Sequence, residues 1–156
     1  MAALELKVPP VVVLILALVG VHYSPVIVPF ISNNYNIPDW QANLASLVFI
    51  FGVLIAIAGV VTFKLAKTTT NPISIGNTSS LVTHGIYRFT RNPMYLGMLM
   101  VILAFIIKTG HIAGLVFAIA FVAYMTRFQI KPEERMLRKI FTDQYTDYMK
   151  RTRPWL

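Results

Sequence analysis

The sequence contains no cysteine, and only 13% of its 156 residues are charged. Without cysteine, disulfide bonds, thiolate metal ligands and cysteine nucleophiles are excluded. The charged fraction is about half of that in a typical soluble domain, whereas 56% of the residues are hydrophobic. This composition excludes an ordinary water-soluble domain and predicts one small membrane-embedded domain spanning residues 1–156.

Acidic residues are the scarcer charges, with six Asp and Glu against fourteen Lys and Arg. None of the acids lies near the centre of a long apolar run, which counts against a proton-coupled transporter. The basic residues flank these runs, so we interpret them as membrane-flanking charges and expect no nucleic-acid partner. With three histidines and no cysteine, we also expect no metal site.

Long uncharged runs predict four membrane-spanning helices. Residues 8–31 and 40–63 contain no Lys, Arg, Asp or Glu, and each is long enough to cross a bilayer. Residues 93–128 form a run of about 36, enough for two spans joined by a tight turn at residues 108–110. The sequence therefore predicts an all-α integral membrane protein whose last two transmembrane helices form a hairpin.

Basic residues also predict the orientation of the chain. They are concentrated in the loop between the second and third spans and in the tail, whereas the other two loops contain only Lys108. The positive-inside rule places the basic loop and both termini in the cytoplasm.

The tail predicts a cytoplasmic amphipathic helix, because apolar residues recur in it at helical spacing. Pro132 suits the first helical position, and Glu133 and Glu134 fall in the first turn, where the helix dipole favours negative charge. Glu134 is also correctly spaced for a surface ion pair with Arg138.

The segment from Thr68 to Asn92 is longer than a simple connection requires, and its second half is aromatic enough to be folded. Asn92 can cap a helix that begins at Pro93, which leaves unpaired amides at the helix start.

Charged and aromatic residues flank this helix start. Arg88 and Arg91 suit a carboxylate or phosphate, and Tyr87 and Tyr95 offer ring faces to an adenine or another flat group. The alternative is an ordinary capped helix with interfacial Arg and Tyr.

Two motifs stand at either end of the predicted hairpin. The first is Arg91-Asn92-Pro93-Met94-Tyr95-Leu96-Gly97, preceded by Gly85-Ile86-Tyr87. The second is Pro132-Glu133-Glu134-x-x-Leu137-x-x-x-Phe141-x-x-x-Tyr145-x-x-Tyr148. Over about residues 81–148, the chain resembles the isoprenylcysteine carboxyl methyltransferase family and its phospholipid methyltransferase relatives.

The resemblance implies a membrane enzyme that transfers a methyl group from S-adenosylmethionine to a lipophilic or amphiphilic acceptor entering from the membrane. It implies a cofactor region over residues 79–150, with Glu133 binding the ammonium group of the methionine moiety. The residues expected at the cofactor are Leu81, Val82, His84, Tyr87, Arg91, Asn92, Pro93, Met94, Tyr95 and Glu133.

Three positions depart from the pattern of this family. Asn92 stands where many members have His, and Thr142 replaces a frequent Gly. In the carboxyl methyltransferases an Arg is associated with the acceptor carboxylate, and Gln129 is closest to that position, with Arg127 nearby. Arg127 is therefore the candidate acceptor-side charge, and the acceptor group stays open between carboxylate, amine and thiol.

Two other functions fit the same residues. A membrane reductase of related architecture would use a nicotinamide cofactor, and a nonenzymatic membrane scaffold would pack the loop and tail without catalysis. The spacing Gly110-x-x-x-Gly114 is that of a close-packing helix motif and is a weak indication of an oligomer.

Overall fold

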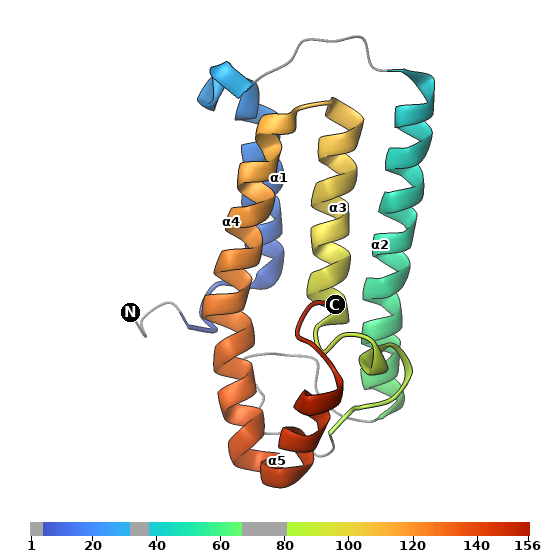
Figure 1. Cartoon of the computed structure of the whole chain (residues 1–156), viewed down its shortest axis with the longest axis vertical. Helices are drawn as coiled ribbons and strands as arrows, with labels where there is room; N and C mark the ends of the chain where they lie inside the picture. Colours follow the sequence, from blue (N-terminus) through green and yellow to red (C-terminus); the bar gives the residue numbers. More distant parts are fainter. Residues whose placement is uncertain (1–4, 32–37, 67–80) are drawn as a thin grey trace.

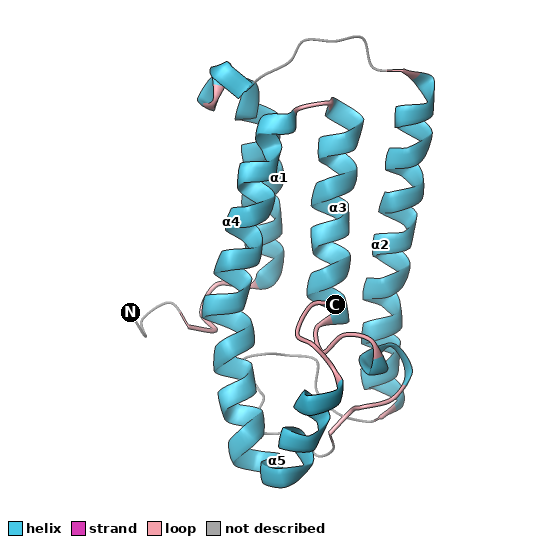
Figure 2. Ribbon diagram, viewed as in Figure 1, coloured by secondary structure: helices cyan, strands magenta, loops and turns pink. Residues whose placement is uncertain are grey.

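The computed structural model describes residues 5–31, 38–66 and 81–156. Its long helices are α1 (Pro10–Ile27), α2 (Asp39–Leu65), α3 (Pro93–Thr109), α4 (Leu115–Met125) and α5 (Lys131–Arg151). Shorter helical segments are η2 (Pro29–Ile31), η4 (Gly85–Arg88), η5 (Ile112–Gly114) and the π-helical η6 (Thr126–Ile130). Over the described ranges Figure 2 contains helices and loops and no strand, which confirms the all-α prediction.

The bundle places α3 in the middle, where it contacts α1, α2 and α4 (Figure 1). The first two helices, and the unit running from η5 through α5, are long and apolar enough to cross a membrane. The third helix is shorter but also apolar. It ends at Gly110, whose φ of 67° makes the tight turn of the predicted hairpin. The buried apolar core lies between α1, α3 and α4.

Glycines allow close contacts within the bundle. A Cβ on Gly97 of α3 would lie 2.5 Å from the carbonyl oxygen of Gly52 in α2, so these two backbones touch. A Cβ on Gly114 would lie 2.9 Å from a methyl carbon of Val21 in α1. Part of the Gly110-x-x-x-Gly114 motif is therefore used inside one chain, and an oligomer stays a prediction.

The tail helix α5 begins at Lys131, within one residue of the predicted Pro132, and Glu133 and Glu134 lie in its first turn as predicted, but no break separates it from α4. Figure 1 shows α4 continuing into α5, and the connection is the π-helical η6. Pro132 has no N–H to donate to the carbonyl of Phe128, four residues earlier. The backbone N–H of Leu6 donates to this carbonyl instead, at 3.0 Å. Because a distant segment supplies the missing donor, the helix passes through the proline.

A sharp reversal divides α5 at Thr142, whose φ is 41° and ψ is −107°. The second half of α5 turns back toward the start of α3 (Figure 1). A positive φ strains any residue with a Cβ and favours glycine. Thr142 is also the position where the family resemblance leads one to expect glycine.

Thr142→Gly is therefore expected to stabilise the protein by about 1 kcal/mol, because it relieves a strained backbone at a modest entropic cost. Thermal unfolding in detergent measures the effect. Thr142→Ala is the matched control, since it keeps the Cβ and should give no comparable gain. Equal shifts for the two variants would contradict the strain explanation.

Part of the predicted long loop, residues 68–80, lies outside the described residues. The first two positions of the expected cofactor region 79–150 lie outside them as well.

Candidate active site

The first turn of α3 and the first turn of α5 meet at Tyr95 and Glu133. The Tyr95 hydroxyl donates to Glu133 Oε1 at 2.5 Å. Glu133 lies past the apolar stretch of the α4–α5 unit. Burial raises the pKa of Glu133 to about 8. The hydrogen bond from Tyr95 lowers this pKa, and the negative charge of Glu134 raises it. Because no Lys or Arg in the described part of the chain pairs with it, Glu133 is largely protonated near neutral pH.

Tyr87 brings a second polar group into this region. Its side chain is 3% exposed, and its hydroxyl is buried without a hydrogen-bond partner in the described structure. Burial raises the pKa of Tyr87, and the charges of Tyr148 and Glu133 raise it further. The ring meets Phe63 edge-on at 5.0 Å. A carboxylate without a cation and a hydroxyl without a partner are suited to a ligand that carries an ammonium group.

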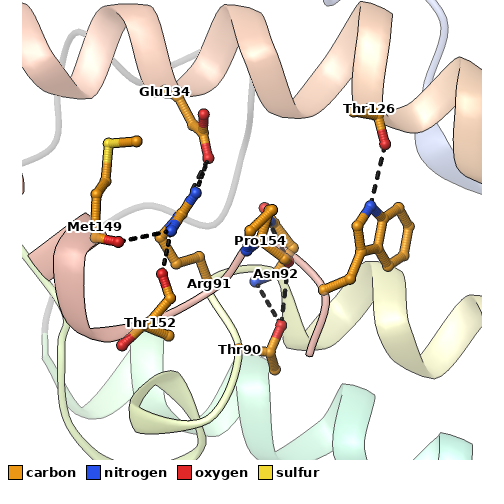
Figure 3. A network of polar contacts seen from close by, with 9 residues as sticks. Thr90, Arg91, Asn92, Thr126, Glu134, Met149, Thr152 and Pro154 are labelled. Carbon is orange, nitrogen blue, oxygen red and sulfur yellow. Dashed lines mark hydrogen bonds and ion pairs between the residues drawn. The ribbon is translucent and has the colours of Figure 1, made fainter.

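Arg91 joins the start of α3 to α5 and to the C-terminal segment (Figure 3). Its Nη2 and Nε atoms donate to Glu134 Oε1 at 2.6 and 3.2 Å, and its Nη1 donates to the carbonyls of Thr152 and Met149. The Arg91 side chain is only 8% exposed. The predicted surface pair of Glu134 with Arg138 is wrong, because the buried guanidinium of Arg91 is the closer partner. A contact between Arg91 and a cofactor stays a prediction.

Asn92 precedes α3 as predicted, but its side chain does not cap the helix. The Asn92 Nδ2 group donates to the Pro154 carbonyl at 2.8 Å, and the Thr90 hydroxyl donates to the same oxygen at 3.2 Å (Figure 3). The Trp155 indole N–H donates to Thr126 Oγ1 at 3.1 Å. The C-terminal segment therefore crosses from the start of α3 to η6. Its Pro154 carbonyl binds the side-chain amide of Asn92, which was expected to cap α3.

The remaining expected cofactor residues lie in three environments. Leu81 and Val82 pack in an apolar cluster with Tyr87, Tyr145 and Tyr148. Pro93 is buried at the start of α3, and Met94 packs against the main core. His84 is exposed just before η4. Arg88, which was noted as suited to an anion but was not among the expected cofactor residues, is exposed at the end of η4.

Two contacts at η6 lay beyond sequence reasoning. Gln129 is fully buried; its Nε2 donates to the Val8 carbonyl at 2.7 Å, and its Oε1 is buried without a partner in the described structure. Arg127 Nη1 lies 2.9 Å from Glu5 Oε1, and Arg135 pairs with the other oxygen of Glu5. The Arg127 bond is the main cause that lowers the pKa of Glu5. A polar residue at the end of an apolar run was the one available signal for Gln129.

Two known proteins are similar to part of this chain. The chain is 32% identical over 115 residues to protein-S-isoprenylcysteine O-methyltransferase A of Arabidopsis thaliana. The aligned stretch covers 70% of this chain and 55% of that protein. The chain thus spans about half the length of this relative. An uncharacterized protein of Haemophilus influenzae is 35% identical over 63 residues, 40% of this chain and all of that protein.

No solved structure matches the chain significantly. The phospholipid methyltransferase family matches residues 40–144, from the start of α2 into the second half of α5. This stretch includes both Tyr95 and Glu133. The chain therefore belongs to the phospholipid methyltransferase family.

Proposed function

We propose that this protein transfers a methyl group from S-adenosylmethionine to a lipophilic or amphiphilic acceptor that enters from the membrane. Family membership supports methyl transfer. The observation that carries the proposal is the half-buried carboxylate of Glu133, which has a hydrogen bond from Tyr95 but no cation among the described residues. The Arabidopsis relative is named as an isoprenylcysteine methyltransferase, which supports a lipophilic acceptor.

Glu133 would hold the ammonium group of the cofactor. A bound ammonium favours the ionised carboxylate, and the Tyr95 hydroxyl keeps the carboxylate in position. The free hydroxyl of Tyr87 adds a further polar contact.

S-adenosylmethionine supplies a methyl group that is already activated by its sulfonium. The residues of the chain then need mainly to align the acceptor and to exclude water. The buried surroundings of Tyr95 and Glu133 suit this role.

Calorimetry of the purified protein with S-adenosylhomocysteine tests the proposal. We expect saturable binding at one site per chain. A scaffold would show no saturable heat, and binding of a reduced nicotinamide cofactor in its place would favour a reductase. Either outcome would overturn the proposal.

We also propose that the Glu133 end of the bundle faces the cytoplasm. Arg88, Lys108 and Lys150 are exposed, and the chain has no cysteine that could interfere with labelling. We expect Arg88→Cys and Lys150→Cys to react with an impermeant maleimide from the cytoplasmic side, and Lys108→Cys from the opposite side. Labelling of Arg88→Cys and Lys150→Cys from opposite sides would contradict this topology.

A further inference from the structure

An apolar groove lies between α1, α2 and α3, in the half of the bundle away from Glu133. Its volume is about 490 Å³, within the range of pockets that hold small molecules. Helix α3 packs against both α1 and α2, whereas α1 and α2 scarcely touch each other. The groove therefore runs along α3 between the two other helices.

Small side chains keep this space open. Ala45 of α2 and Ala104 of α3 are each 3% exposed and line the groove, and Ser46 adds a third small side chain. Leu18 and Phe105 make its lining more apolar. Protein interiors are closely packed, and an empty hollow loses dispersion contacts on one side. Because the bilayer core supplies no water to fill it, the groove is suited to a hydrocarbon chain.

Lys108 is the one charged residue that lines the groove, and it lies in the last turn of α3. All six acids of the sequence are in the described ranges, and none forms an ion pair with Lys108. The helix dipole favours a lysine at this position, but that effect needs no hollow beside the lysine. A lysine at a membrane edge extends its ammonium group to the level of the lipid headgroups. An unpaired cation at the end of an apolar groove matches a molecule with an anionic head and a hydrocarbon tail.

The groove is separate from the candidate active site. Its lining on α3 begins at Val101, six residues after Tyr95, which is about 9 Å along the helix. None of the residues expected at the cofactor lines the groove. An amphiphile whose head lies beside Lys108 therefore belongs to the leaflet opposite the Glu133 end.

We propose that this groove binds one anionic phospholipid of that leaflet, with an acyl chain against Ala45 and Ala104 and the phosphate group beside Lys108. The proposal does not depend on methyl transfer, because the groove and the candidate active site share no lining residue. The bound lipid would join α1 to α2 across α3. Since it binds the folded bundle, it would also stabilise that bundle.

Native mass spectrometry of the full chain tests the proposal by counting the lipids that stay bound when the detergent is removed. The probes are dioleoylphosphatidylglycerol, which is anionic, and dioleoylphosphatidylcholine, which has the same chains and no net charge. Both are added in equal amounts to the protein in a neutral detergent. We expect one phosphatidylglycerol per chain, retained about fivefold more than phosphatidylcholine, as one lysine near an anionic headgroup allows. Equal retention of the two lipids, retention of neither, or a dimer of the chain in place of the lipid would overturn the proposal.

Lys108→Met keeps the length of the side chain and removes its charge, so the fivefold preference for phosphatidylglycerol should disappear. Lys64→Met is the matched control, because it removes an exposed cation from the last turn of α2, at the other end of the bundle. It should leave the preference unchanged. Equal losses in the two variants would show that membrane-flanking cations in general attract the lipid, and this would overturn the assignment to the groove.

Ser46→Phe places a ring in the groove and should abolish the retention of phosphatidylglycerol. The Ser46 hydroxyl donates to the Ala42 carbonyl of its own helix, so the substitution breaks no contact between helices through this group. Leu47→Phe is the control, because Leu47 is 66% exposed and does not line the groove. Equal lipid retention in the two variants would contradict the proposed site. If Lys108→Met does not fold, this pair and the comparison of the two lipids on the unmodified protein decide.

Discussion

Glu133→Gln is expected to weaken the binding of S-adenosylhomocysteine by a factor of roughly ten to one hundred. A hydrogen bond between charged groups contributes about 1.5–3 kcal/mol, and glutamine keeps the shape of Glu133 without its charge. In the unmodified protein the affinity should rise about tenfold per pH unit from pH 6 to 7.5, because the pKa of ligand-free Glu133 is about 8 and the ammonium binds the ionised form. Calorimetry at three pH values measures both effects.

The same substitution is expected to stabilise the ligand-free protein at alkaline pH. Glu133 binds its proton more tightly in the folded state, where its pKa is about 8, than at its ordinary value of 4.5. Between pH 4.5 and pH 8 the folded state therefore binds more protons than the unfolded state. The stabilisation that the proton on Glu133 gives the folded state is complete below pH 4.5 and is lost as the pH rises through 8. The amide introduced by Glu133→Gln cannot ionise, so this loss should disappear.

Thermal unfolding at pH 5 and pH 8.5 tests this sign. Asp143→Asn, an exposed change on the same helix, should leave the difference between the two pH values as it is in the unmodified protein. A Glu133→Gln variant with unchanged ligand affinity and an unchanged pH profile would remove Glu133 from the site.

Arg91→Met is expected to destabilise the protein by about 3–5 kcal/mol. It leaves the buried carboxylate of Glu134 without a counter-charge and leaves the carbonyls of Thr152 and Met149 without their Arg91 donors. Adding Glu134→Gln should restore part of the loss, since no buried charge then remains unpaired at this contact. Chemical denaturation in mixed micelles measures the free energy of unfolding.

Lys150→Met is the matched control for Arg91→Met. The ion pair of Lys150 with Asp147 is exposed on both sides, so its loss should have little effect on the free energy of unfolding. Similar effects for the two variants would show that burial does not decide the strength of the Arg91 pair.

Local signals predicted the helices well. Uncharged runs marked α1 and α2, Pro93 marked the start of α3, and Gly110 marked the hairpin turn. Each of these features determines the conformation of residues adjacent to it in the sequence, so the local sequence is enough to predict the helix bounds.

The errors at the site have the opposite origin. Pro132 marks the first turn of α5, but the sequence does not show that α4 continues into it, where Leu6 donates to Phe128. Glu134 pairs with Arg91, 43 residues away, and not with the local Arg138. The motif pointed to Glu133 and Tyr95, but the raised pKa of Glu133 depends on burial by the folded chain. Gln129 stood out locally as a polar residue at the end of an apolar run, but its partner Val8 is 121 residues away and could not be predicted.

The bond between Leu6 and Phe128 also has a consequence for the order of assembly. Synthesis produces the segment around Glu5 before the α4–α5 junction, and the sequence separation of Glu5 and Arg127 is 122. Until these distant parts meet, the carbonyl of Phe128 lacks the hydrogen bond that Leu6 donates and that Pro132 cannot. Closure over so long a separation is slow compared with helix formation. We therefore expect the junction below the site to become rigid only as a late, post-insertion step, after the individual helices have formed.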